Sequence, residues 1–146
     1  MPGRRLFVAV PLPDRSVEEI AALVGRVRGA LPAGLDGGQP GHGPRRDVRW
    51  VRLDGLHLTL RFLGPTLEPD VGPVAEALRA VAAEATPFRV VIGGAGAFPH
   101  PARPRALWLA VRSGTAELME LASALDRALA PAGWPPSDRP FRPHLT

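Results

Sequence analysis

Apolar residues along this chain follow spacings typical of strands in some segments and of helices in others. Short runs that are apolar or alternate in polarity predict strands, and proline, glycine or charge ends each of them. The predicted strands are residues 4–13, 50–64, 88–97 and 106–112. Apolar residues that recur every three to four positions predict helices over residues 17–31, 71–85 and 115–130.

The first predicted strand, residues 4–13, is apolar almost throughout, so we expect both of its faces to be buried. The first helix should begin at a capping box formed by Ser16 and Glu19. Its expected buried positions are Val17, Ile20, Leu23, Val24 and Val27. Those of the second helix are Val74, Leu78, Val81 and Ala82, with Pro73 in its first turn. Those of the third are Leu118, Leu121, Ala122, Leu125 and Leu129, with Thr115 as its cap.

Two glycine- and proline-rich segments are predicted to be loops. Residues 32–46 contain Gly37-Gly38, Pro40-Gly41 and Gly43-Pro44, a composition that favours a flexible loop. This loop precedes a strand with polar chemistry, so it is either a flap over a site or a surface insertion. Residues 98–105 hold three prolines and are predicted to leave the strand before them.

The strand predicted over residues 50–64 combines a buried face with a chemically active one. Side chains alternate between the two faces of a strand, so His57, Thr59 and Arg61 should share one face. Leu58, Leu60 and Phe62 should enter the core from the other. Two residues of strand separate His57 from Thr59 by roughly 6.5 Å, a distance at which both can reach different oxygens of one phosphate.

The same three letters, His-Leu-Thr, return at His144, Leu145 and Thr146. Each copy follows an aromatic residue and an arginine, Trp50 and Arg52 in the first and Phe141 and Arg142 in the second. Residues 134–143 approach the second copy through several prolines. Because the second motif would sit in mid-strand at Thr146, we expect a single domain over 1–146 that is truncated there and lacks closing strands.

The order of predicted elements is strand, helix, strand, helix, strand, strand, helix, strand. This order indicates an α+β domain with two pseudo-repeated lobes that each end in His-Leu-Thr.

Composition excludes several kinds of chemistry. The chain has no cysteine, so thiolate catalysis, disulfides and cysteine-bound zinc are absent. All 18 basic residues are arginine, so no Schiff-base or P-loop lysine exists. The net charge of +4 mildly favours an anionic partner. We expect a cytoplasmic protein, because no apolar run is long enough to span a bilayer and no signal-peptide pattern is present.

Two histidines on separate strands suit the opening of a cyclic phosphate by water. Attack and departure occur on opposite sides of phosphorus, so a base is needed on one side and an acid on the other. Imidazole serves both roles near neutral pH, and threonine hydroxyls can donate hydrogen bonds to the non-bridging oxygens.

Four segments resemble one enzyme family. They are R-L-F-V-A-V near the start, V-R-W-V-R-L-D-G-L-H-L-T-L-R-F-L-G, G-A-F-P-H-P-A-R-P-R-A-L-W-L and D-R-P-F-R-P-H-L-T. In this order they resemble the RNA 2',3'-cyclic phosphodiesterases, also named 2'-5' RNA ligases, of the two-histidine (2H) phosphoesterase superfamily. The resemblance implies a bilobal α+β fold, in which each pseudo-symmetric lobe has an antiparallel sheet flanked by helices and the active-site cleft lies between the lobes.

The resemblance also implies the reaction and the residue roles. The reaction is hydrolysis of an RNA 2',3'-cyclic phosphodiester to a 2'-phosphomonoester, without metal, ATP or another cofactor, with reversible 2'-5' ligation as a side activity. His57 matches the proton donor, His144 the proton acceptor, and Thr59 and Thr146 the phosphate-binding hydroxyls. Arg61 and Arg142 are candidate substrate contacts. The expected protein is a monomer that binds RNA and no membrane.

Other interpretations remain open. A noncatalytic module that binds RNA ends would need the same pocket, and His57, His144 and His100 could instead bind zinc. His100 and His42 are expected in exposed loops. Trp50, Trp108 and Phe98 are either core residues or platforms on which a base stacks.

Overall fold

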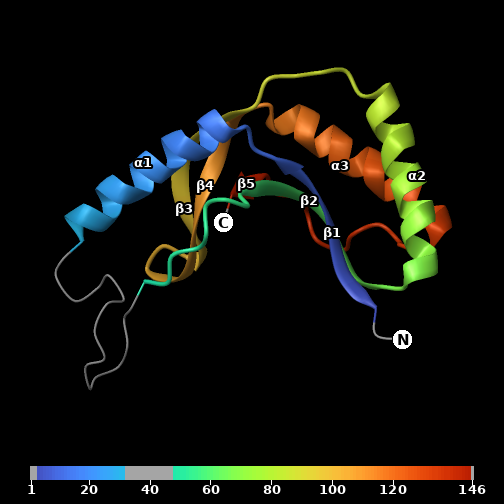
Figure 1. Cartoon of the computed structure of the whole chain (residues 1–146), viewed down its shortest axis with the longest axis horizontal. Coiled ribbons are helices and arrows are strands. Elements are labelled where there is room, and N and C mark those ends of the chain that lie inside the picture. Colours follow the sequence, from blue (N-terminus) through green and yellow to red (C-terminus); the bar gives the residue numbers. More distant parts are fainter. Residues whose placement is uncertain (1–2, 32–47, 146) are drawn as a thin grey trace. The chain divides into compact units, whose positions relative to one another are not determined.

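The computed structural model describes residues 3–31 and 48–145, and Figure 1 shows its elements. The helices are α1 (Asp14–Ala30), α2 (Glu68–Glu84) and α3 (Thr115–Leu129), followed by a short 3₁₀ turn, η1 (Ala130–Ala132). The strands are β1 (Arg4–Pro11), β2 (His57–Thr66), β3 (Val91–His100), β4 (Arg103–Ser113) and β5 (His144–Leu145). Their order confirms the predicted alternation. The loop predicted over 32–46, which includes His42, and the hydroxyl of Thr146 lie outside the described residues.

The chain forms two compact units, residues 11–56 and residues 1–10 with 57–146. The smaller unit contains α1, which begins after Pro13 with no side-chain cap, so the predicted Ser16–Glu19 capping box is wrong. Ile20 is buried, whereas Leu23 and Val27 are exposed, contrary to the prediction. In the same unit the Arg28 guanidinium lies 5.5 Å from the centre of the Trp50 ring.

The larger unit contains both sheets. Strands β1 and β2 form a two-stranded sheet within the described residues. A Cβ on Gly3 would lie 2.9 Å from the Thr66 carbonyl oxygen, so the start of β1 runs beside the end of β2. The prediction that β1 is buried on both faces is wrong, since Val8 is buried but Phe7 is 46% exposed.

The second sheet has the strand order β3-β4-β5 and is antiparallel. The predicted loop over 98–105 is wrong, because Phe98 pairs with Ala106 and His100 with Arg103. Pro99 faces Pro104 at the end of this hairpin, where the register is irregular. Proline is tolerated at such a point because few ladder hydrogen bonds depend on it.

Helix α3 supplies the centre of the core in the larger unit, and it packs against α2 and β2. Four of its predicted core positions are buried, namely Leu118, Ala122, Leu125 and Leu129. In α2, Val74 is buried as predicted, but Ala82 is exposed and Pro73 lies inside the helix, past its first turn. None of the helices in the described residues is long and apolar enough to cross a membrane.

Candidate active site

His57 is the first residue of β2. Leu58 and Leu60 are only 4% and 8% exposed, so alternation along the strand turns His57 and Thr59 to the opposite face. Both of those residues are half-buried. The imidazole of His57 stacks on the Phe7 ring of β1, with 4.8 Å between ring centres and 24° between planes. This contact restrains the orientation of the imidazole.

Phe62 was predicted to enter the core with Leu58 and Leu60, and this prediction is wrong. Its side chain is 74% exposed, and its ring centre lies 6.2 Å from that of Phe7. The inward pattern is therefore interrupted at Phe62, where Phe62 of β2 and Phe7 of β1 expose their rings, and Thr66 at the end of β2 is buried again.

His144 is the first residue of β5, the last strand of the second sheet. The register pairs His144 with Ala110 and Leu145 with Leu109, and Leu145 is 2% exposed. Burial of Leu145 anchors this short strand and leaves the half-buried imidazole of His144 on its other face. The rings of Phe98 and Trp108 flank this imidazole in edge-to-face contacts. The distances between ring centres are 5.2 Å for Phe98 and 6.0 Å for Trp108.

The Nδ1 atom of His144 lies 2.5 Å from the Arg142 carbonyl oxygen. A carbonyl oxygen only accepts, so Nδ1 carries the hydrogen of this bond. In a neutral imidazole the Nε2 atom then has the free lone pair and can take a proton. This is the tautomer that a general base needs.

Strands β2 and β5 lie in contact within the larger unit. The two His-Leu-Thr motifs therefore begin on neighbouring strands that belong to different sheets. Of the four predicted chemical groups, His57, Thr59 and His144 are described. Thr146 follows the buried Leu145 directly.

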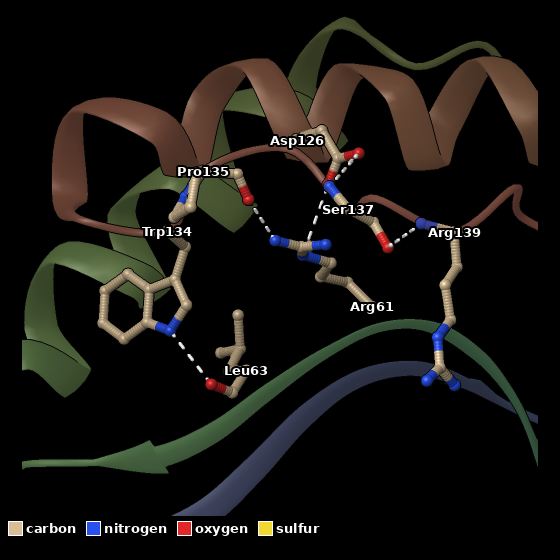
Figure 2. A network of polar contacts seen from close by, with 7 residues as sticks. All are labelled: Arg61, Leu63, Asp126, Trp134, Pro135, Ser137 and Arg139. Atoms are coloured by element: carbon tan, nitrogen blue, oxygen red, sulfur yellow. Dashed lines mark hydrogen bonds and ion pairs between the residues drawn. The ribbon is translucent and has the colours of Figure 1, made fainter.

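Arg61 takes part in a network that joins β2 to α3 and to the segment before β5 (Figure 2). Its side chain is 12% exposed, and its Nε atom lies 3.2 Å from Oδ1 of Asp126, which is 24% exposed. These two atoms are close enough for an ion pair, but they are not aligned as a hydrogen bond. Another guanidinium nitrogen of Arg61 donates to the Pro135 carbonyl oxygen.

Two further hydrogen bonds belong to this network. The Ser137 amide donates to Oδ2 of Asp126 at 3.4 Å, and Trp134 Nε1 donates to the Leu63 carbonyl oxygen at 3.2 Å. Neither Asp126 nor Trp134 was predicted to be a partner of β2. The only sequence signal was the arginine itself, since a charge on a strand that is otherwise half-buried needs a partner.

The remaining candidate residues lie at the surface or in the hairpin. The Arg142 side chain is exposed. His100 is exposed as expected, but it is the last residue of β3 and not part of a loop, and its Nδ1 accepts a hydrogen bond of 3.1 Å from the Ala102 amide. Among the described residues no group of three His, Cys, Asp or Glu side chains is arranged to hold a metal ion.

Arg52, upstream of the first motif, pairs with Asp54 at 2.7 Å on the surface. Hydrogen bonding by Arg52 lowers the pKa of the Asp54 carboxyl, and the same contact raises the pKa of Arg52. The Arg52 guanidinium is therefore bound to a carboxylate two residues further on, in the turn that leads into β2.

An α+β fold with paired His-x-Thr motifs defines the class of two-lobed 2H phosphoesterases. The chain belongs to the 2'-5' RNA ligase superfamily, whose profile matches residues 13–146. It is 36% identical to the RNA 2',3'-cyclic phosphodiesterase of Aeropyrum pernix over 99 residues, which cover 68% of this chain and 55% of that protein. It is 32% identical to the enzyme of that name from Geobacillus stearothermophilus, over 96% of this chain and 40% of the relative. The chain thus spans about half the length of these relatives.

The fold agrees with a solved structure of the superfamily. The crystal structure of Escherichia coli LigT in apo form matches with a TM-score of 0.71 and 29% identity, over 100% of this chain and 72% of LigT. LigT complexed with 3'-AMP matches with a TM-score of 0.68 and 28% identity, over the same shares of the two chains.

Proposed function

We propose that this chain hydrolyses RNA 2',3'-cyclic phosphodiester ends to 2'-phosphomonoesters, with His57 and His144 as the acid and base. The observation that carries the proposal is that strands β2 and β5, which begin with these two histidines, lie in contact within one compact unit. The similarity to proteins named RNA 2',3'-cyclic phosphodiesterase supports the choice of substrate.

The proposed base is His144. Its Nε2 takes a proton from water as the water oxygen bonds to phosphorus, and the hydrogen bond from Nδ1 to the Arg142 carbonyl supports this role. The P–O3' bond breaks on the opposite side, and His57 gives its proton to O3'. The product has a 2'-phosphate and a free 3'-hydroxyl. If the 5'-hydroxyl of a second RNA attacks in place of water, the same steps form a 2'-5' linkage.

The proposed phosphate contacts are the hydroxyls of Thr59 and Thr146. Each stands two positions after its histidine, so each can donate to a non-bridging oxygen while the imidazole faces a bridging or attacking oxygen. The exposed guanidinium of Arg142 is a further candidate contact with the RNA backbone.

The test uses an RNA oligonucleotide with a terminal 2',3'-cyclic phosphate, incubated with the protein in EDTA and without ATP. We expect a product that is heavier by one water and that co-migrates with a 2'-phosphate standard and not with the 3'-phosphate. His57→Ala and His144→Ala should each lower turnover by about 10²- to 10⁴-fold, the usual contribution of an acid or base.

His100→Ala is the matched control, because this histidine is exposed at the end of β3 and its replacement should leave turnover unchanged. Binding of the RNA without conversion would contradict the enzyme and favour a noncatalytic RNA-end-binding module. Loss of activity in EDTA together with loss in His100→Ala would instead favour the zinc site.

A further inference from the structure

The ion pair between Arg61 and Asp126 differs from other ion pairs of the described residues in its shielding from water. Arg15 and Glu19 are paired at a similar distance, 3.3 Å, but their side chains are 89% and 71% exposed. The corresponding exposures of Arg61 and Asp126 are 12% and 24%. Charges that are partly removed from water interact more strongly, and loss of one partner leaves the other poorly solvated.

This pair and its hydrogen bonds join β2 to two segments that lie much further along the chain, α3 and residues 134–139 (Figure 2). Arg61 is on β2, two residues beyond Thr59, and Asp126 is near the end of α3. The Arg61 guanidinium also donates to the Pro135 carbonyl, and the Asp126 carboxylate accepts from the Ser137 amide. Trp134 reinforces the connection through its hydrogen bond to Leu63 of β2.

Residues 134–139 lead into β5 and lie in no helix or strand, and Trp134 at their start donates its backbone N–H to the Leu129 carbonyl oxygen at the end of α3. Strand β5 is held to the second sheet through only two register pairs, Leu109 with Leu145 and Ala110 with His144. Within the described residues, the network around Arg61 therefore connects β2, the strand of His57, to the segment that precedes His144.

We propose that Arg61 is a positioning residue that, through Asp126 and Pro135, sets the separation of the two histidines, and that it does not contact the substrate. The inference rests on the proposed function for its catalytic consequence, but the fastening of the 134–139 segment can be measured without any substrate. A guanidinium that already faces a carboxylate and a carbonyl has fewer donors left for a phosphate.

The experiment compares three variants with the wild-type protein. Two are the single substitutions Arg61→Gln and Asp126→Asn. The third is a double substitution, Arg61→Asp together with Asp126→Arg, that exchanges the two charges. Arg15→Gln is the matched control, since it removes an arginine from an exposed pair. Hydrogen exchange of peptides from residues 134–145 is the first readout. We expect exchange there to be about tenfold faster or more in both single variants, because each unpairs a shielded charge. Peptides from the β3–β4 hairpin and the Arg15→Gln protein should be unchanged.

The second readout is the steady-state kinetics with the cyclic-phosphate RNA. Both single variants should lower kcat by about 10- to 100-fold with little change in KM, since misplacing a catalytic group by an ångström has that effect. The charge exchange should restore part of the protection and part of the turnover.

Three results decide between the possibilities. If Arg61→Gln raises KM while Asp126→Asn alters neither exchange nor turnover, Arg61 binds substrate and the proposal is overturned. If exchange over 134–145 stays at the wild-type rate in both single variants, the fastening role is wrong. If the wild-type protein has no turnover but both variants speed exchange, the proposed function fails and the fastening role stands.

Arg61→Lys replaces Arg61→Gln if the latter does not fold. It should show a smaller effect of the same kind, because lysine keeps the positive charge but lacks the planar guanidinium that can bind two partners at once.

Discussion

Gly96 shows how one residue without a side chain controls the surroundings of His144. A Cβ at position 96 would lie 2.2 Å from the indole of Trp108, far inside contact distance. The indole can therefore lie this close to the β3 backbone only because position 96 is glycine. Trp108 in turn stacks with Phe98 at 5.3 Å, and both rings flank the imidazole of His144.

We predict that Gly96→Ala displaces Trp108 and disturbs His144. It should cost about 1–3 kcal/mol of unfolding free energy, the usual range for overpacking, and it should lower kcat. Urea unfolding followed by tryptophan fluorescence measures the first effect. Gly25→Ala in α1 is the control, because a Cβ there meets nothing within 4 Å and alanine favours a helix. Equal stability of the two variants would contradict this account of Gly96.

For single residues, the sequence predicts burial best where the alternation of side chains along a strand alone decides which face a residue lies on. Leu58 and Leu60 turn inward as predicted, because apolar side chains follow the period of the strand. The exposure of Phe62 and the partners of Arg61 could not be predicted. They depend on Phe7 and Asp126, which are distant in sequence, and no local pattern encodes such contacts.

Among the elements, α3 was predicted most closely, since its leucines keep a helical spacing over the full length. It begins at Thr115 as predicted, but Thr115 is not its cap, because Gly114 at φ 87° holds the cap position and the Thr115 hydroxyl donates to the Val111 carbonyl oxygen. A Cβ on Gly114 would lie 2.6 Å from the Arg89 carbonyl oxygen, so close packing against the segment just before β3 requires glycine at this boundary.

Helix α3 should contribute strongly to stability through its buried face. Leu129 is fully buried at 0% exposure, so Leu129→Ala should cost about 2–5 kcal/mol. Met119 on the same helix is 48% exposed, so we expect Met119→Ala to change stability by less than about 0.5 kcal/mol. Chemical denaturation monitored by circular dichroism compares the two. A smaller loss for Leu129→Ala than for Met119→Ala would show that α3 is not the centre of this core.

The β3–β4 hairpin shows why propensity failed for one element. Its prolines predicted a loop, but they lie at the hairpin end, where Pro99 faces Pro104 and irregular pairing is tolerated. Strand β1 failed for a different reason. A continuous apolar run was read as burial on both faces, whereas the described sheet that contains β1 has only β2 beside it.

For the molecule as a whole, the sequence predicted the order of elements and the repeat of His-Leu-Thr. It could not predict which strands pair, because pairing depends on contacts between residues far apart in the chain. The structure assigns the first motif to the β1-β2 sheet and the second to the β3-β4-β5 sheet, and it brings β2 and β5 into contact.

The most direct test of the proposed acid and base roles of the two histidines is the pH dependence of the single-turnover rate. It is measured for the wild-type protein, His57→Ala and His144→Ala. A base must be deprotonated and an acid protonated, so the wild-type rate should rise and then fall as pH increases. His144→Ala should lose the rise, and His57→Ala should lose the fall. A wild-type rate that does not vary with pH, or two variants that both keep the rise and the fall, would contradict the two-histidine account.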